Sequence, residues 1–147
     1  MRATLQRVSQ AEVRVDGAIV GRVGRGWLVL LGVGHGDTEQ HAARMADKVV
    51  RLRLFGDTEG KFNLSALDIG AEILVVSQFT LYADTTRGRR PSFVDAAEPE
   101  KARALVDRFA QMVRDYGLKV ETGLFGAHME VSLTNDGPVT VNLTVGE

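Results

Sequence analysis

The segment Trp27-Leu28-Val29-Leu30-Leu31 decides the fold class, because it is a continuous apolar run of strand length. Such a run is typical of a strand that is covered on both faces. A second run, Ile73-Leu74-Val75-Val76, has the same character. Strands of this kind need a further layer on the sheet, and the helical segments described below can supply it. We therefore predict an α/β fold.

Other segments alternate polar and apolar residues with a period of two, which favours half-buried strands. They are residues 2–8, 12–15, 19–23, 129–134 and 139–145. Asp16-Gly17 predicts a hairpin turn between the second and third of these segments. Asn135-Asp136-Gly137-Pro138 predicts a turn between the last two. The expected sheet is mixed and mainly antiparallel.

Two segments have helical periodicity instead. Asp37 is a candidate N-cap with Gln40 three residues later, and an apolar stripe follows at Ala42, Met45, Val49 and Leu52. Pro99 suits the first position of a second helix, whose apolar residues keep helical spacing up to Tyr116, and Gly117 is its stop signal. We expect this second helix to cover the sheet.

The composition is that of an ordinary globular domain: 147 residues, 44% apolar, 25% charged and a formal net charge of -1. A chain of this length forms one core, so residues 1–147 are expected to be a single domain. The absence of cysteine excludes thiol catalysis, disulfides and thiolate zinc sites. No apolar run approaches the ~18 residues of a membrane span, and we expect a cytoplasmic protein that uses no cofactor.

The glycine-rich segment Gly32-Val33-Gly34-His35-Gly36 lies between a predicted strand and a predicted helix, which is where dinucleotide-binding loops occur. The third glycine of that motif would fall at Asp37. A carboxylate at a helix N-terminus would repel the phosphate that such a loop binds. A structural turn is therefore favoured over a nucleotide site.

Histidines and serines give no conventional catalytic pattern. His35, His41 and His128 lack the spacing of a helical zinc pair, and His41 is expected to face out of its helix. No Gly-x-Ser-x-Gly nucleophile elbow is present, so a serine hydrolase would lack its usual scaffold. No metal site is expected.

Two short segments are the best candidates for chemistry. Ser77-Gln78-Phe79-Thr80 follows a buried strand directly, although its hydroxyls could also end the strand by bonding local backbone. Gly137-Pro138 reads as a plain turn or as an X-Pro bond in the cis form, which about 5–6% of such bonds adopt. A cis bond would turn two carbonyl groups to one side.

A third segment concentrates positive charge. Arg87, Arg89 and Arg90 lie in a loop shaped by Gly88 and Pro91. Guanidinium groups can bind phosphate through two hydrogen bonds, so one hypothesis is contact with a phosphate backbone. The other is a solvated loop. Because the net charge is close to zero, any site for a polyanion must be a local patch such as this one.

Together these segments resemble the D-aminoacyl-tRNA deacylase family, the enzymes that remove D-amino acids wrongly attached to tRNA. The resemblance spans nearly the whole chain and is strongest at residues 77–84, Ser-Gln-Phe-Thr-Leu-Tyr-Ala-Asp. The other matching blocks are residues 6–8, 15–17, 30–33, 63–65, 88–93, 121–123, 125–127 and 135–140.

The resemblance implies a barrel-like α/β fold covered by two main helices, and a homodimer in which Gly137-Pro138, joined by a cis bond, reaches into the partner's active site. It assigns the catalytic pocket to Ser77, Gln78, Phe79 and Thr80, and Met129 as a further lining residue. The Gly137 and Pro138 carbonyls would hold the α-amino group of the substrate and leave room for a side chain in one direction only. An L-residue would then clash, while D-residues and glycine would fit.

The implied mechanism uses water. Backbone N–H groups near Gln78 and Phe79 would position it, and the terminal 2′-OH of the tRNA would assist. Thr80 is the side-chain alternative, as a nucleophile or orienting group. Arg87, Arg89 and Arg90 are expected to contact phosphates near the RNA 3′ end.

Two rival function classes remain open at this point. One is a non-catalytic nucleotide or nucleic-acid binding protein that uses Gly32 to Gly36 and the arginine loop. The other is an esterase with Ser77 or Thr80 as nucleophile.

Overall fold

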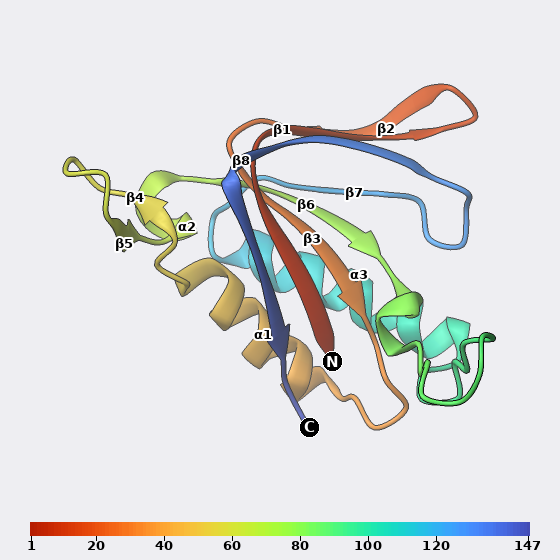
Figure 1. Cartoon of the computed structure of the whole chain (residues 1–147). Coiled ribbons are helices and arrows are strands. Elements are labelled where there is room, and N and C mark those ends of the chain that lie inside the picture. Colours follow the sequence, from red (N-terminus) through yellow and green to blue (C-terminus); the bar gives the residue numbers. More distant parts are fainter.

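The computed structural model describes residues 1–147 and combines one large curled sheet with helices on one side (Figure 1). The elements follow in this order: β1 (Arg2–Val15), β2 (Ala18–Val23), β3 (Gly26–Gly32), α1 (Glu39–Arg51), β4 (Phe55–Gly56), β5 (Phe62–Leu64), α2 (Ala66–Ile69), β6 (Glu72–Ser77), the 3-10 turn η1 (Phe79–Tyr82), α3 (Pro99–Asp115), β7 (Val120–Thr122) and β8 (Glu130–Thr144). None of the helices has both the length and the apolar character needed to cross a bilayer.

The six-stranded sheet has the order β2-β1-β3-β6-β7, and β8 pairs with the other side of β1. β1 is antiparallel to β2, β3 and β8, whereas β6 is parallel to β3 and β7. The sheet curls so far that β2 reaches β7: a Cβ added at Gly21 would lie 2.6 Å from the carbonyl oxygen of Thr122. The expected mixed, mainly antiparallel, barrel-like sheet with two main helices is confirmed.

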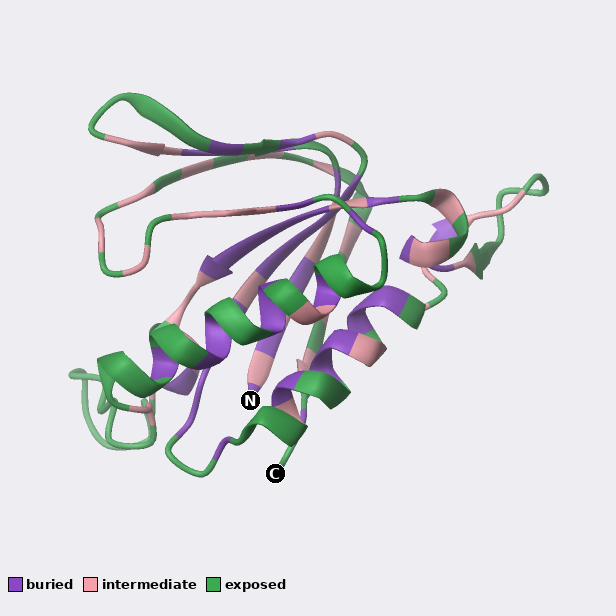
Figure 2. Ribbon diagram, turned by 180° about the vertical axis from the view of Figure 1, so that it is seen from behind, coloured by how far each residue is buried: buried purple, intermediate pink, exposed green.

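β3 and β6 are buried on both faces, as their apolar runs predict. Trp27, Val29 and Leu31 point toward the helices, while Leu28 joins a smaller core inside the curled sheet. Figure 2 shows the buried faces of α1 and α3 turned toward the sheet and their exposed faces turned away from it. The carboxyl ends of β3 and β6 therefore emerge between two packed layers.

Residues 2–8 and 12–15 belong to a single strand, β1, and not to two strands as predicted. β1 pairs with β3 through its first half and with β2 through its second half. Alternation alone does not reveal that a strand changes partners along its length. The Asp16-Gly17 hairpin turn is confirmed, with φ angles of 50° and 80° that fit a tight turn between twisted strands.

The predicted turn at Asn135 to Pro138 is wrong, because β8 does not fold back there. It continues along β1, with Asn135 opposite Val8 and Thr140 opposite Gln6. Residues 136–139 thus face only Arg7 and form a bulge. The Asn135 side chain closes this bulge by accepting a hydrogen bond from the Val139 N–H at 3.0 Å, and the Gly137-Pro138 bond is cis.

Helix α1 begins one residue later than predicted. Its N-cap is Thr38, and His41 completes the capping box by accepting a hydrogen bond from the Thr38 N–H at 3.1 Å. His41 is therefore half-buried and folded back on the helix start, so the expectation that it faces outward is wrong. Asp37 is not the N-cap residue, and its side chain is buried. Helix α3 begins at Pro99, as predicted.

Candidate active site

A cavity of about 660 Å³ lies where β6 ends, between the curled sheet and the start of α3. It brings together four of the predicted site residues: Ser77, Gln78, Phe79 and Met129. Thr80 is exposed just beyond the cavity wall. The cavity is also lined by residues that sequence reasoning did not assign to a site: Val33, Val76, Phe93, Ala96, Ala97, Glu98, Pro99, Ala102, Phe125, Gly126, Ala127, His128 and Val131.

The end of β6 fixes the turn that carries the predicted chemistry. Ser77 pairs with Leu31 in the parallel ladder, and the Gln78 N–H donates to the Leu31 carbonyl at 2.8 Å. The chain then enters η1, in which the Leu81 N–H donates to the Gln78 carbonyl at 3.3 Å. The first N–H groups of a helical turn have no partner inside it. Because the Gln78 N–H is engaged by Leu31, the donors that this turn can offer to a ligand are the N–H groups of Phe79 and Thr80, and not those of Gln78 and Phe79 as expected.

The side chains of the turn supply no base. The Gln78 amide donates to the Thr80 hydroxyl oxygen, and a donor cannot remove the proton of that hydroxyl. No group of three His, Cys, Asp or Glu side chains is placed to hold a metal ion. The positive end of the α3 dipole does lie at the cavity wall, because Glu98 and Pro99 line it. The cavity lining is mostly apolar, and its titratable side chains, Glu98 and His128, lie outside the turn that carries the backbone donors.

Two aromatic side chains stand at the mouth of the cavity. Phe79 is 54% exposed and Phe93 is 37% exposed, and their ring centroids lie 5.0 Å apart in an edge-to-face arrangement. Exposed aromatic rings next to a polar site are a common stacking surface for unpaired nucleic-acid bases. Phe93 belongs to a loop without periodicity, so no local signal except the matching block 88–93 pointed to it.

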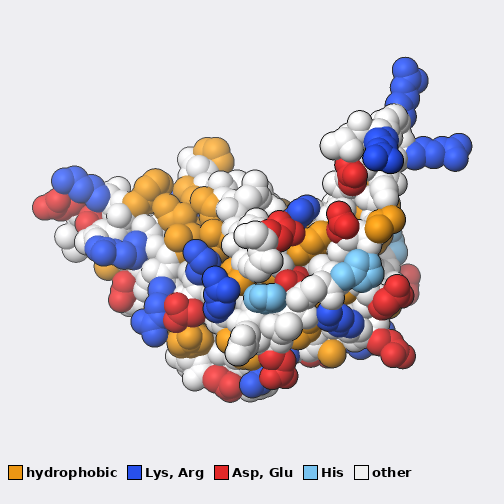
Figure 3. Space-filling model, turned by 90° about the horizontal axis from the view of Figure 1, so that it is seen from below, with side chains coloured by type: hydrophobic (Ala, Val, Ile, Leu, Met, Phe, Trp, Pro, Cys, Tyr) orange, Lys and Arg blue, Asp and Glu red, His pale blue; other side chains and the backbone are white.

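The arginine loop projects from the body of the molecule close to this mouth. Two hydrogen bonds between the backbones of Asp84 and Ser92, of 2.8 and 2.9 Å, close its base. The loop follows η1 at the lower right of Figure 1, and Figure 3 shows basic side chains at the tip of a projecting lobe on the same side. Arg87, Arg89 and Arg90 are exposed and have no hydrogen-bond or ion-pair partner. Their positive charges are therefore available to bind an anion.

Gly137 and Pro138 do not belong to this cavity within one chain. Their bulge lies opposite Arg7, which is level with Trp27 on β3 and with Ile73 on β6, four residues before Ser77. Four residues along a strand and three strand spacings across the sheet separate the two segments by roughly 20 Å. Figure 1 shows the bulge beside the β8 label and η1 on the other side of the molecule. The structure therefore leaves the two predicted halves of the site apart.

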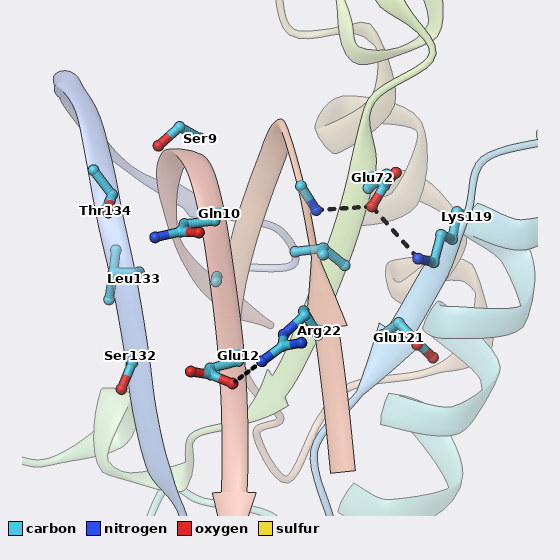
Figure 4. A pocket seen from close by; sticks show the side chains of 13 residues that line it. Ser9, Gln10, Glu12, Arg22, Glu72, Lys119, Glu121, Ser132, Leu133 and Thr134 are labelled. Carbon is cyan, nitrogen blue, oxygen red and sulfur yellow. Dashed lines mark hydrogen bonds and ion pairs between the residues drawn. The ribbon is translucent and has the colours of Figure 1, made fainter. Parts of the chain in front are cut away.

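A second cavity, of about 680 Å³, lies at the opposite end of β6 (Figure 4). Its charged side chains largely neutralise one another: Arg22 lies 3.1 Å from Glu12, and Lys119 lies 3.6 Å from Glu72. Glu72 also accepts a hydrogen bond from the Gly24 N–H at 2.8 Å. None of the predicted site residues lines this groove, and its contacts tie strand ends together.

Comparison with known proteins identifies the family. The family model described as D-Tyr-tRNA(Tyr) deacylase matches residues 4–144. The chain belongs to this family. It is 62% identical to the D-aminoacyl-tRNA deacylase of Roseiflexus castenholzii over 143 residues, which cover 97% of this chain and 91% of that protein. It is 58% identical to the D-aminoacyl-tRNA deacylase of Thermomicrobium roseum over 147 residues, which cover 100% and 96%.

Solved structures share the deacylase fold. A structure described as c-Myc DNA Unwinding Element Binding Protein is 39% identical, has a TM-score of 0.94 and covers 100% of both chains. A structure described as a probable eukaryotic D-amino acid tRNA deacylase is 21% identical, has a TM-score of 0.84 and covers 97% of both chains. This second match shows similarity of fold alone. Membership in the deacylase family makes the chain an ester hydrolase.

Proposed function

We propose that the chain hydrolyses the ester bond of D-aminoacyl-tRNA and releases a free amino acid and tRNA. The observation that carries this proposal is the position of the block Ser77-Gln78-Phe79, which lines a cavity large enough for an aminoacyl group. The same block carries the strongest resemblance to the deacylase family, to which the chain belongs.

In this proposal the N–H groups of Phe79 and Thr80 receive the oxyanion that forms when water attacks the ester carbonyl. Donors placed in advance at such an oxygen can each contribute roughly 3–4 kcal/mol to catalysis. The terminal 2′-OH of the tRNA assists the attack, because the side chains of the turn supply no base. The Gln78 amide orients the Thr80 hydroxyl and is not a proton acceptor.

Chiral selection in this proposal requires a second copy of the chain. The Gly137-Pro138 bulge lies roughly 20 Å from Ser77 in the same chain, so it can complete the pocket only in a homodimer. Its carbonyls then hold the α-amino group and exclude L-residues by steric conflict. Glycine has no side chain to clash, so glycine mischarged on tRNA is a second substrate.

The RNA end is held outside the cavity. The rings of Phe79 and Phe93 offer a stacking surface for an unpaired base, and the unpaired Arg87, Arg89 and Arg90 meet phosphates. Both features lie on the mouth side of the cavity, so an aminoacyl group would enter between them. Met129 lines the cavity itself.

The decisive experiment compares hydrolysis of matched D- and L-aminoacyl-tRNA, with the corresponding small aminoacyl esters as controls. Turnover of the D-aminoacyl-tRNA alone is the expected result. Binding of nucleic acid without turnover would favour a binding protein, the class suggested by the description of the 39% identical structure. Equal turnover of free esters would favour a Ser77 or Thr80 nucleophile.

A further inference from the structure

We infer that Asp37 and Tyr82 are positioning residues that hold η1, and with it the N–H groups of Phe79 and Thr80, in the geometry that ester hydrolysis requires. The inference rests on the proposed function for its chemical meaning. Its structural part, that these two side chains fix the turn, can be tested without a substrate.

Tyr82 is the last residue of η1, and it is the only residue of the turn that is buried. Its hydroxyl donates to Oδ2 of Asp37 at 3.3 Å. The same carboxylate accepts a hydrogen bond from the Gly34 N–H at 2.7 Å and pairs through Oδ1 with the Met1 amine at 2.6 Å. Asp37 thus joins the chain after β3, the start of β1 and the catalytic turn at one buried point.

Two glycines form the surface on which the turn rests. A Cβ added at Gly32 would lie 2.9 Å from the Gln78 carbonyl oxygen, and one added at Gly34 would lie 2.8 Å from the Tyr82 hydroxyl. Side chains at these positions would push η1 away from β3. The glycine pair that resembles part of a dinucleotide loop therefore has a different purpose, which is to let the catalytic turn approach the strand.

Arg2 holds the turn from a third direction. Its guanidinium lies 4.4 Å from the centroid of the Tyr82 ring, and Nη1 donates to the Leu81 carbonyl at 2.9 Å. Burial, reinforced by the negative charge of Asp37, raises the pKa of Tyr82 far above its usual value. The phenol therefore keeps its proton at neutral pH and remains a donor to Asp37.

Fixing the turn matters because a catalytic donor is effective only within a narrow range of positions. A displacement of about 1 Å from a change away from the reacting atoms can lower a rate by up to about 100-fold. Phe79 and Thr80 precede Tyr82 by three and two residues in the same short turn. A hinge at Tyr82 would therefore move both N–H groups.

The first test is Tyr82→Phe, which removes the hydroxyl and keeps the ring. Its matched control is Tyr116→Phe, which removes another hydroxyl hydrogen bond, 3.1 Å to Asp47 of α1, at the C-terminal end of α3 and away from the cavity. Kinetics with D-aminoacyl-tRNA should show kcat reduced about tenfold by Tyr82→Phe with KM unchanged, and neither constant altered by Tyr116→Phe. A rise in KM without a change in kcat, or equal kcat values for the two variants, would overturn the inference.

The second test uses glycines of one loop. Gly34→Ala places its Cβ against Tyr82, whereas Gly36→Ala meets no atom within 4 Å. Gly34→Ala should lower kcat at least as much as Tyr82→Phe, and Gly36→Ala should leave it unchanged. A Gly34→Ala enzyme with normal kcat would count against the close packing of η1 on Gly34.

Amide hydrogen exchange in the absence of substrate separates this inference from the proposed function. In Tyr82→Phe the N–H groups of Leu81 and Ala83, which close η1, should exchange about fivefold faster or more, while amides of α1 keep their rates. Unchanged exchange would overturn the inference even in an active enzyme. Faster exchange in a protein that fails to hydrolyse D-aminoacyl-tRNA would support the positioning of the turn and refute the proposed function.

Discussion

Replacement of Asp37 by asparagine tests the buried ion pair at the start of α1. Asp37 is 6% exposed and the Met1 amine is fully buried, and their charged atoms lie 2.6 Å apart. Asparagine keeps the shape and can still accept from the Gly34 N–H, but it leaves the ammonium group without a counter-charge. Breaking a buried pair in this way costs about 3–5 kcal/mol. For a domain of this size that corresponds to a fall in melting temperature of roughly 6–20 °C.

The assay is urea and thermal unfolding of Asp37→Asn beside Asp47→Asn. Asp47 pairs with Arg51 at 2.7 Å, but its side chain is 51% exposed. Exposed pairs of this kind contribute about 0–1 kcal/mol, so the control should unfold within ~1 kcal/mol of the unchanged protein. Equal losses of unfolding free energy in the two variants would refute the view that Asp37 is a buried anchor.

Three more sets of substitutions test the site and the loops. Thr80→Ala should retain measurable deacylation in single-turnover assays, because the hydroxyl has no base; a complete loss together with a trapped acyl-enzyme in the unchanged protein would identify a nucleophile. Replacing Arg87, Arg89 or Arg90 by glutamine should weaken tRNA binding. It should also lower the slope of log affinity against log salt concentration by about 0.7 for each phosphate that is no longer neutralised. An unchanged slope would show that the replaced arginine does not contact RNA phosphate. Hydrogen bonds from Ser65, the N-cap residue of α2, hold the pKa of Asp68 below the usual value of an aspartate, and the bond from the Ser65 backbone N–H has the largest effect. The stability that this carboxylate adds is therefore present above the usual pKa and is lost as the pH falls through the lowered one. Urea unfolding between pH 6 and pH 3 should show a shallower acid dependence for Asp68→Asn, and the same slope as the unchanged protein would contradict this assignment.

The parts of the fold that were predictable are those with strong local patterns. The apolar runs of β3 and β6 reveal burial on both faces, and Pro99 marks the start of α3. The bulge of β8 was misread because Asn-Asp-Gly-Pro has the chemistry of a turn in either setting. Whether the chain reverses or continues there depends on pairing with β1, more than 120 residues earlier in the sequence. Local chemistry carries no information about that partner.

The candidate site shows the same division. Ser77 to Phe79 could be found because they follow a buried strand and carry the family resemblance, and Met129 was carried over from that resemblance. The remaining walls come from loops without periodicity, such as the one that holds Phe93. The sequence predicts Asp37 as a helix cap because its position suits one. Its actual partner, the Met1 amine, is brought close only when the start of β1 pairs with the end of β3. Long-range contacts define these roles.

In the proposed dimer each active site combines the cavity of one chain with the Gly137-Pro138 bulge of the other, and mixing two inactive variants tests this arrangement. Ala127→Trp fills the cavity. Gly137→Ala places a Cβ 2.7 Å from the Val139 nitrogen at a φ of +145° and distorts the bulge.

Each variant alone should fail to hydrolyse D-aminoacyl-tRNA. In a random mixture half of the dimers pair one variant with the other, and each of these contains one site with both parts intact, so about one quarter of the unchanged activity should return. If the cavity and the bulge act within one chain, every site in the mixed dimers keeps one defect. If a mixture shown to contain the mixed dimer recovers no activity, the site is not shared between two chains.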